Sequence, residues 1–146
     1  MLKGIPDIIS PELLKVIAEM GHGDTLVIGD CNFPASSMAK AKNHINIRCD
    51  GLKATAILDA LLQLFPLDDF VEQPVALMQK ADKNLPTPIW DEFSDIVSKY
   101  DKRGKNAIRF IDRFDFYEES RNAYAVVSTS EKALYGCIII QKGCLL

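Results

Sequence analysis

His22 is the side chain of this sequence best suited to acid–base chemistry. It is one of two histidines, and it stands between Gly21 and Gly23 in the turn expected between a helix and a buried strand. Such a turn holds a ring on the scaffold without packing it into the core. Histidine has the ordinary pKa closest to neutrality, so this position favours a general acid or base. The alternative interpretation is a solvent-exposed loop histidine.

Asp30 follows the apolar run 25–29, at the strand end where α/β domains present ligand-binding groups. Its carboxylate could accept hydrogen bonds from ligand hydroxyls, or it could simply cap a turn or helix. The four steps of this run, at ~3.3 Å each, separate its two ends by roughly 13 Å. His22 precedes the run and Asp30 follows it. One small ligand therefore reaches both only if a loop folds back or a second subunit contributes one of them.

Two more pairs of polar side chains have spacings that place them together. Arg113 and Tyr117 are four residues apart in a helical segment, which puts them on one face. Tyr135 and Cys137 are two apart in an expected strand and should also share a face. A guanidinium and a phenol on one face could bind polyol hydroxyls. Surface charge beside a half-buried aromatic explains the first pair too, and a sheet core explains the second.

The sequence has no motif typical of a metal site, a cofactor site or a catalytic nucleophile. A zinc site needs closer cysteine spacing and more histidine, so we interpret the cysteines as reduced thiols. The sequence has neither a P-loop nor a dinucleotide-binding glycine pattern, and its serines lack the surroundings of a nucleophile elbow. We expect no metal and no cofactor. The four cysteines are Cys31, Cys49, Cys137 and Cys144.

Composition indicates one globular domain over residues 1–146. The net charge of −3 gives no reason to expect nucleic acid or an anionic membrane surface as partner. We interpret the basic run 102–105 as a solvated loop. No apolar run approaches the ~20 residues of a membrane span. The first six residues resemble the start of a mature protein and not a signal peptide, so we expect a cytoplasmic location.

The elements expected to position these residues alternate along the chain. Ser10 can cap a first helix and Pro11 suits its first position, with Gly21 ending it. Alternating helices and buried strands predict an α/β fold, a single layered domain whose buried central sheet is flanked by helices. The expected helices cover residues 11–20, 35–41, 53–65, 88–100 and 112–122; the expected strands cover 25–29, 44–48, part of 70–79, 124–129 and 135–141.

Seven short segments together form a recognisable pattern along the chain. They are Ala-Glu-Met-Gly-His-Gly-Asp at 18–24, Asp-x-Asn-Phe-Pro at 30–34, Arg-Cys-Asp-Gly-Leu at 48–52, Pro-Leu-Asp at 66–68, Asp-Arg-Phe-x-Phe-Tyr-Glu at 112–118, Ala-Tyr-Ala-Val-Val at 123–127 and Tyr-Gly at 135–136. In these segments the chain resembles the L-fucose mutarotase family, relatives of D-ribose pyranase. Each segment is short, but their joint occurrence in order over nearly the whole length is hard to produce by chance.

The resemblance implies a mutarotase fold and an enzyme that interconverts the α and β anomers of L-fucose without metal or cofactor. It also implies ring-shaped homo-oligomers, commonly decamers, with sugar sites near subunit contacts. By position, His22 is expected to be the catalytic proton donor, with Tyr117 or Tyr135 as its proton partner. The sugar-contacting residues that the resemblance implies are Asp30, Asp68, Met78, Arg113, Tyr117 and Tyr135.

Cys137 departs from the family pattern, which usually has asparagine after Tyr-Gly. A carboxamide donates and accepts hydrogen bonds to a sugar, and a thiol does both poorly. Ser130 likewise replaces a usual glycine. Two alternative functions therefore stay open. One is D-ribose pyranase activity, and the other is a monosaccharide-binding protein that has lost turnover.

Overall fold

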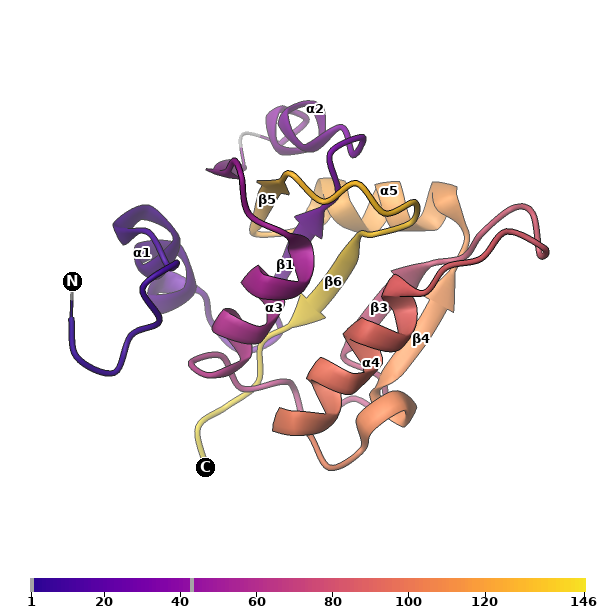
Figure 1. Cartoon of the computed structure of the whole chain (residues 1–146). Helices are drawn as coiled ribbons and strands as arrows, with labels where there is room; N and C mark the ends of the chain where they lie inside the picture. The colour runs from indigo at the N-terminus through magenta and orange to yellow at the C-terminus, as the bar shows by residue number, and fades with distance from the viewer. Residues whose placement is uncertain (1, 43) are drawn as a thin grey trace.

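Six strands form one mixed sheet in the computed structural model, which describes residues 2–42 and 44–146 (Figure 1). Met1, part of the expected mature N-terminus, lies outside the described residues. The sheet order is β2-β5-β1-β6-β3-β4. The strands are β1 Thr25–Gly29, β2 Ile45–Cys49, β3 Val75–Met78, β4 Ile108–Ile111, β5 Ala125–Thr129 and β6 Ile138–Gln141. The helices are α1 Pro11–Glu19, α2 Ala35–Lys40, α3 Ala54–Leu62, α4 Ile89–Tyr100 and α5 Arg113–Asn122, with a 3₁₀ turn η1 at Gly104–Ala107.

Strand direction gives the sheet two different edges. β1 pairs parallel with β5, β5 with β2, and β3 with β4, whereas β6 runs antiparallel between β1 and β3. The carboxyl ends of five strands therefore meet the start of β6 at one edge. The amino ends of β1 and β3 meet the end of β6 at the opposite edge.

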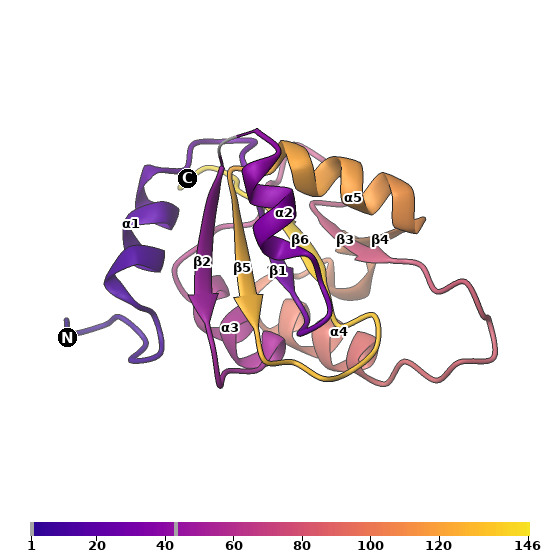
Figure 2. The same cartoon turned by 90° about the horizontal axis from the view of Figure 1, so that it is seen from above.

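Helices cover both faces of the sheet (Figure 2). Ile28 and Ile138 face a core formed with α1, α3 and α4. Val27 and Ile139, their neighbours along the strands, face a second core formed with α2 and α5. These strands are apolar at successive positions because both of their faces are buried. The predicted α/β fold with a buried central sheet is confirmed.

The start of α1 follows the predicted capping. The Ser10 hydroxyl accepts the Leu13 N–H at 3.1 Å, and Pro11 is the first helical residue. The other four expected helices are present within one to three residues at each end. Between 70 and 79 only Val75–Met78 is a strand, because Pro74 lacks the N–H that a ladder needs.

Two predictions about local structure are wrong, and one strand was missed. The missed strand is β4, which has alternating burial and a single partner strand. β6 begins at Ile138, so Tyr135 and Cys137 precede it and do not alternate within it. Tyr135 has φ 56°, a left-handed backbone conformation that interrupts extension. Arg103, within the expected solvated loop, is largely covered and bonded.

No helix in the described part of the chain is long and apolar enough to cross a membrane.

Candidate functional site

A cavity of about 310 Å³ lies where the parallel strands end and β6 begins. We call it the Asp30 cavity. Ligand pockets commonly have volumes of about 300–1,000 Å³, so this one suits a small molecule. The predicted site residues that line it are Asp30, Met78, Arg113, Tyr117, Tyr135 and Cys137, and they share it with Asn32, Phe33, Leu85 and Leu134.

Asp30 provides a nearly buried carboxylate at the end of β1. It is 9% exposed, and it accepts N–H groups from Asn32 at 2.9 Å and Gly136 at 3.2 Å. Burial raises the pKa of Asp30 above its ordinary value, against the lowering effect of these backbone donors. Each carboxylate oxygen accepts one backbone bond, and carboxylate oxygens can accept further bonds from a ligand's hydroxyls.

The first turns of α5 place a cation and a phenol on the cavity wall. Asp112 caps this helix by accepting the Phe114 and Asp115 N–H groups at 2.8 and 3.0 Å. Arg113 and Tyr117, one turn apart, both line the cavity, as the helical spacing predicted. The Tyr117 ring packs on Phe33 with centroids 5.9 Å apart.

Tyr135 is held by two elements that are distant in sequence. Its hydroxyl accepts the Ala81 N–H at 3.2 Å, and its carbonyl oxygen accepts the Trp90 indole N–H at 3.3 Å. These contacts come from the β3–α4 connection and from α4. Sequence reasoning missed both, because neither partner belongs to the motifs around Tyr135.

Cys137 lines the cavity from within the second core. It is 1% exposed, and burial together with the charge of Asp30 raises the pKa of its thiol. The thiol is therefore neutral at physiological pH. Cys137 shares the cavity with Tyr135, but through the turn before β6 and not through strand alternation.

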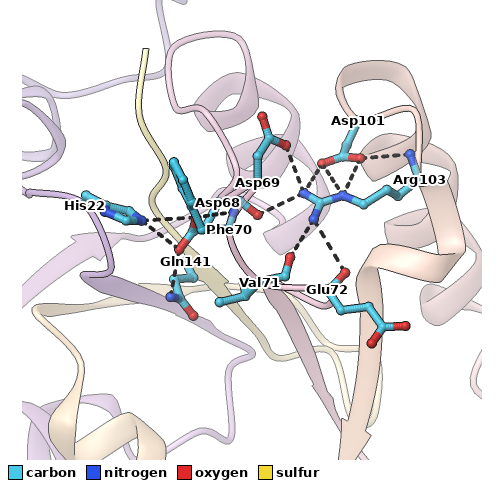
Figure 3. A network of polar contacts seen from close by, with 9 residues as sticks. All are labelled: His22, Asp68, Asp69, Phe70, Val71, Glu72, Asp101, Arg103 and Gln141. Atoms are coloured by element: carbon cyan, nitrogen blue, oxygen red, sulfur yellow. Dashed lines mark hydrogen bonds and ion pairs between the residues drawn. The ribbon is translucent and has the colours of Figure 1, made fainter. Parts of the chain in front are cut away.

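His22 lies at the opposite edge of the sheet, beside Asp68 (Figure 3). Its Nε2 is 3.1 Å from both carboxylate oxygens of Asp68. The His22 side chain is 46% exposed, whereas that of Asp68 is 2% exposed. The ring also meets Phe70, with centroids 5.2 Å apart. Phe70 N–H and the Gln141 amide donate to Asp68 at 2.9 and 3.0 Å.

This arrangement assigns the proton on the His22 ring. A carboxylate only accepts hydrogen bonds, so Nε2 carries a hydrogen and donates it to Asp68. Nδ1 is then the nitrogen that can exchange a proton with a ligand. The carboxylate thereby fixes the orientation of the ring.

His22 and the Asp30 cavity do not meet within one chain. β1 lies between His22 and Asp30, and β6 places Gln141 beside Asp68 but Cys137 at the Asp30 cavity. Next to His22 is a separate apolar hollow of about 520 Å³ between α1 and the C-terminal residues 142–145. Among residues 2–42 and 44–146, no group of three or more His, Cys, Asp or Glu side chains is arranged to hold a metal ion.

Comparison with known proteins finds close relatives over the full length. The model of the RbsD / FucU transport protein family matches residues 3–145. The fucose mutarotase of Mus musculus is 46% identical, over 99% of this chain and 95% of that protein. The crystal structure of FucU from Bifidobacterium longum is 50% identical with a TM-score of 0.95, covering 99% of this chain and 100% of that one. The fucose mutarotase of Streptococcus pneumoniae, crystallised with L-fucose, is 39% identical with a TM-score of 0.90, covering the same shares.

Proposed function

We propose that this chain, which belongs to the RbsD / FucU transport protein family, is an isomerase, a mutarotase that interconverts the α and β anomers of L-fucopyranose. The whole chain forms one mutarotase domain in this proposal. Relatives named fucose mutarotases, 42–46% identical over nearly the full chain, support the reaction. The observation that carries the proposal is the Asp30 cavity, where a carboxylate, a guanidinium and two phenols face one small volume.

Each ring opening and each ring closure requires two proton transfers, and the oxidation state does not change. One group protonates the ring oxygen while another takes the proton of the anomeric hydroxyl, and the C1–O5 bond breaks. The open aldehyde then turns about C1–C2 and recloses on its other face, which returns both protons. Acid–base catalysis of this kind contributes typically ~10²–10⁴-fold, and it needs neither metal nor cofactor.

The residues have complementary roles in this reaction. His22 exchanges a proton through Nδ1 at the anomeric centre, and Asp68 stabilises the imidazolium that forms. Tyr117 or Tyr135 is the second proton carrier, at the ring oxygen. Asp30 and Arg113 bind sugar hydroxyls, while Met78 and Cys137 shape the cavity wall.

The separation of His22 from the Asp30 cavity supports a site shared between subunits. In this proposal the chain forms a ring-shaped homo-oligomer, a decamer, in which His22 of one copy faces the Asp30 cavity of the next. Such a head-to-tail contact uses two different surfaces, and both carry exposed apolar side chains. Phe70 beside His22 is 70% exposed, Leu134 at the cavity is 54% exposed, and Phe114, which packs against Arg113 of the cavity wall, is 72% exposed. The free thiols of the four cysteines are consistent with the reducing cytoplasm as the location.

Saturation-transfer NMR tests the reaction. Saturating one anomeric proton of L-fucose should reduce the signal of the other in proportion to the concentration of the protein. The same protein with His22→Ala is the control and should leave only the spontaneous exchange. Absence of protein-dependent transfer in the folded wild type would refute the proposal.

Mixing two inactive variants tests the shared site. His22→Ala retains the Asp30 cavity, and Arg113→Met retains His22. Refolding equal amounts together should restore about a quarter of the sites, because each intact site then takes one residue from each variant in a heterologous ring. Activity that stays absent in the mixed oligomer, or a monomeric mass with full activity, would contradict the arrangement.

Cys137 favours one alternative, a sugar-binding protein without turnover, because a neutral buried thiol stands where the resemblance implies a carboxamide. Binding of L-fucose without anomer exchange would identify it. The same NMR experiment on D-ribose tests the other alternative, since pyranose–furanose exchange on ribose in place of L-fucose exchange would indicate a pyranase.

A further inference from the structure

The segment 68–74 enters β3 without regular structure, and one guanidinium holds its backbone. Arg103 donates from Nη2 to the carbonyl oxygen of Asp68 at 3.0 Å and from Nη1 to that of Val71 at 2.7 Å (Figure 3). The Glu72 carbonyl lies 3.5 Å from the same Nη1. The planar fork of an arginine suits such simultaneous contacts, because its donors have a fixed geometry.

Arg103 is itself fixed from the end of α4. Its Nε and Nη2 donate to the Asp101 carboxylate at 3.0 and 2.6 Å. The Arg103 side chain is 22% exposed and that of Asp101 is 8% exposed. Hydrogen bonds from the guanidinium lower the pKa of Asp101, and the same contacts raise the pKa of Arg103. The pair is therefore charged at physiological pH, and it fixes the guanidinium against the helix end.

The segment that Arg103 holds supplies the described contacts of the His22 ring. Asp68 accepts from Nε2, and Phe70 packs against the ring. The Asp68 backbone is bonded on both sides, since its N–H donates to the Gln141 carbonyl at 3.1 Å and its own carbonyl accepts from Arg103. Arg103 does not contact His22, so any influence on the ring acts through Asp68 and Phe70.

We infer that Arg103 is a positioning residue, which sets the orientation and the tautomer of His22 by fixing the 68–72 backbone. The inference rests on the proposed function for its effect on catalysis, but its effect on the ring needs no substrate. Misplacing a catalytic group by about 1 Å can cost about 10²-fold in rate. The loss should therefore appear in kcat and not in substrate binding.

The test compares Arg103→Met with Arg109→Met. Arg109 forms a two-bond ion pair with Glu119 at 2.9 and 2.7 Å, with its side chain 34% exposed. Its loss therefore matches the loss of charge and donors at Arg103 without touching the 68–72 segment. Nitrogen-15 NMR of the His22 imidazole in the sugar-free protein reports which ring nitrogen carries hydrogen.

We expect Arg103→Met to convert a single Nε2–H signature of His22 into a mixture of tautomers, and Arg109→Met to leave it unchanged. On L-fucose, Arg103→Met should lower kcat about tenfold to a hundredfold, with KM changed by less than about twofold. In an Asp68→Asn background the same substitution should lower kcat by a smaller factor than in the wild type, because the part of its effect that acts through Asp68 is already lost.

An unchanged imidazole spectrum and wild-type kcat in folded Arg103→Met would overturn the inference, as would equal effects in Arg109→Met. If the methionine variant is unstable, Arg103→Lys is measured in its place. It keeps the charge but cannot make the forked contacts, so an intermediate tautomer mixture supports the inference and a wild-type spectrum contradicts it. If the wild type shows no exchange but the spectra differ as expected, the proposed function fails and the positioning role stands.

Discussion

Asp68→Asn tests the dependence of His22 on its carboxylate partner. The substitution preserves shape, and one oxygen can still accept the Phe70 N–H, which lies 2.9 Å from Asp68 Oδ1. The new amide hydrogen lies on the Oδ2 side, which His22 Nε2 and the Gln141 amide nitrogen approach at 3.1 and 3.0 Å. Gln141 can turn its amide to accept. His22 Nε2 also lies 3.1 Å from Oδ1, so it can either keep donating to the remaining oxygen or accept from the new amide, which would place its hydrogen on Nδ1.

The expected loss follows from the interaction removed. A hydrogen bond to a charged group contributes ~1.5–3 kcal/mol, and Asp68 provides it to the imidazolium that forms during ring opening. That range corresponds to a loss in kcat of about 10- to 150-fold. In molecules where His22 accepts from the new amide, the changed tautomer adds to this loss, because neutral His22 then presents a hydrogen and not a lone pair at Nδ1. Binding of L-fucose should change less than kcat, because Asp30 and Arg113 are untouched.

The assay is the rate of anomer exchange by NMR over a range of L-fucose concentrations, with circular dichroism to verify folding. Asp59→Asn is the matched control, since Asp59 is a helix-surface carboxylate that contacts Lys99 and Tyr100. The control should retain wild-type exchange. A folded Asp68→Asn protein with wild-type kcat would refute the role of Asp68.

Three further outcomes are expected. His22→Ala should lose most protein-dependent exchange, on the order of 10²-fold or more, with little change in Tm because its side chain is 46% exposed; full activity in this folded variant would exclude the catalytic role. Cys137→Asn should tighten L-fucose binding about twofold to tenfold through one added hydrogen bond of ~0.5–1.5 kcal/mol, measured by titration; unchanged or weaker affinity with a clear drop in Tm would assign residue 137 to the core alone. The Tm difference between wild type and Arg103→Met should be largest near neutral pH and should shrink as the pH falls below 3.8, the ordinary value from which the guanidinium lowers the pKa of Asp101. A carboxyl group with a lowered pKa stabilises the fold above its unfolded pKa and loses this contribution as the pH falls through its folded pKa, so a constant difference down to pH ~2 would contradict the contribution of Asp101.

Elements with a strong apolar pattern were predictable, and elements defined by distant partners were not. Thr25–Gly29 is apolar because both faces are buried, so its pattern sufficed. β4 has only β3 beside it and exposes part of its surface, and its four residues Ile-Arg-Phe-Ile carry too short a pattern to separate from a loop. Arg103 seemed solvated because two carbonyls that it binds, at 68 and 71, lie more than thirty residues earlier.

The candidate site was predictable to the extent that strand ends define it. Asp30 follows β1, and helical spacing placed Arg113 with Tyr117 on the same cavity. The two-residue period of a strand did not apply to Tyr135, because its backbone is left-handed. The residues that hydrogen-bond to it there, Trp90 and Ala81, are far away in sequence. His22 and Asp68 lie at the same edge of the sheet because β6 runs antiparallel beside β1. The sequence around His22 and Asp68 does not indicate in which direction β6 pairs.

The central place of β6 has a consequence for how the chain is made. β6 separates β1 from β3 in the sheet, yet it follows both of them in the chain and leaves the ribosome after them. Until Ile138–Gln141 is available, β2-β5-β1 and β3-β4 can pair only as two part-sheets, each with an unsatisfied apolar edge. Such edges invite pairing with other chains. We therefore expect a product truncated before Ile138 to aggregate, because pairing of β6 is the step that joins the two part-sheets.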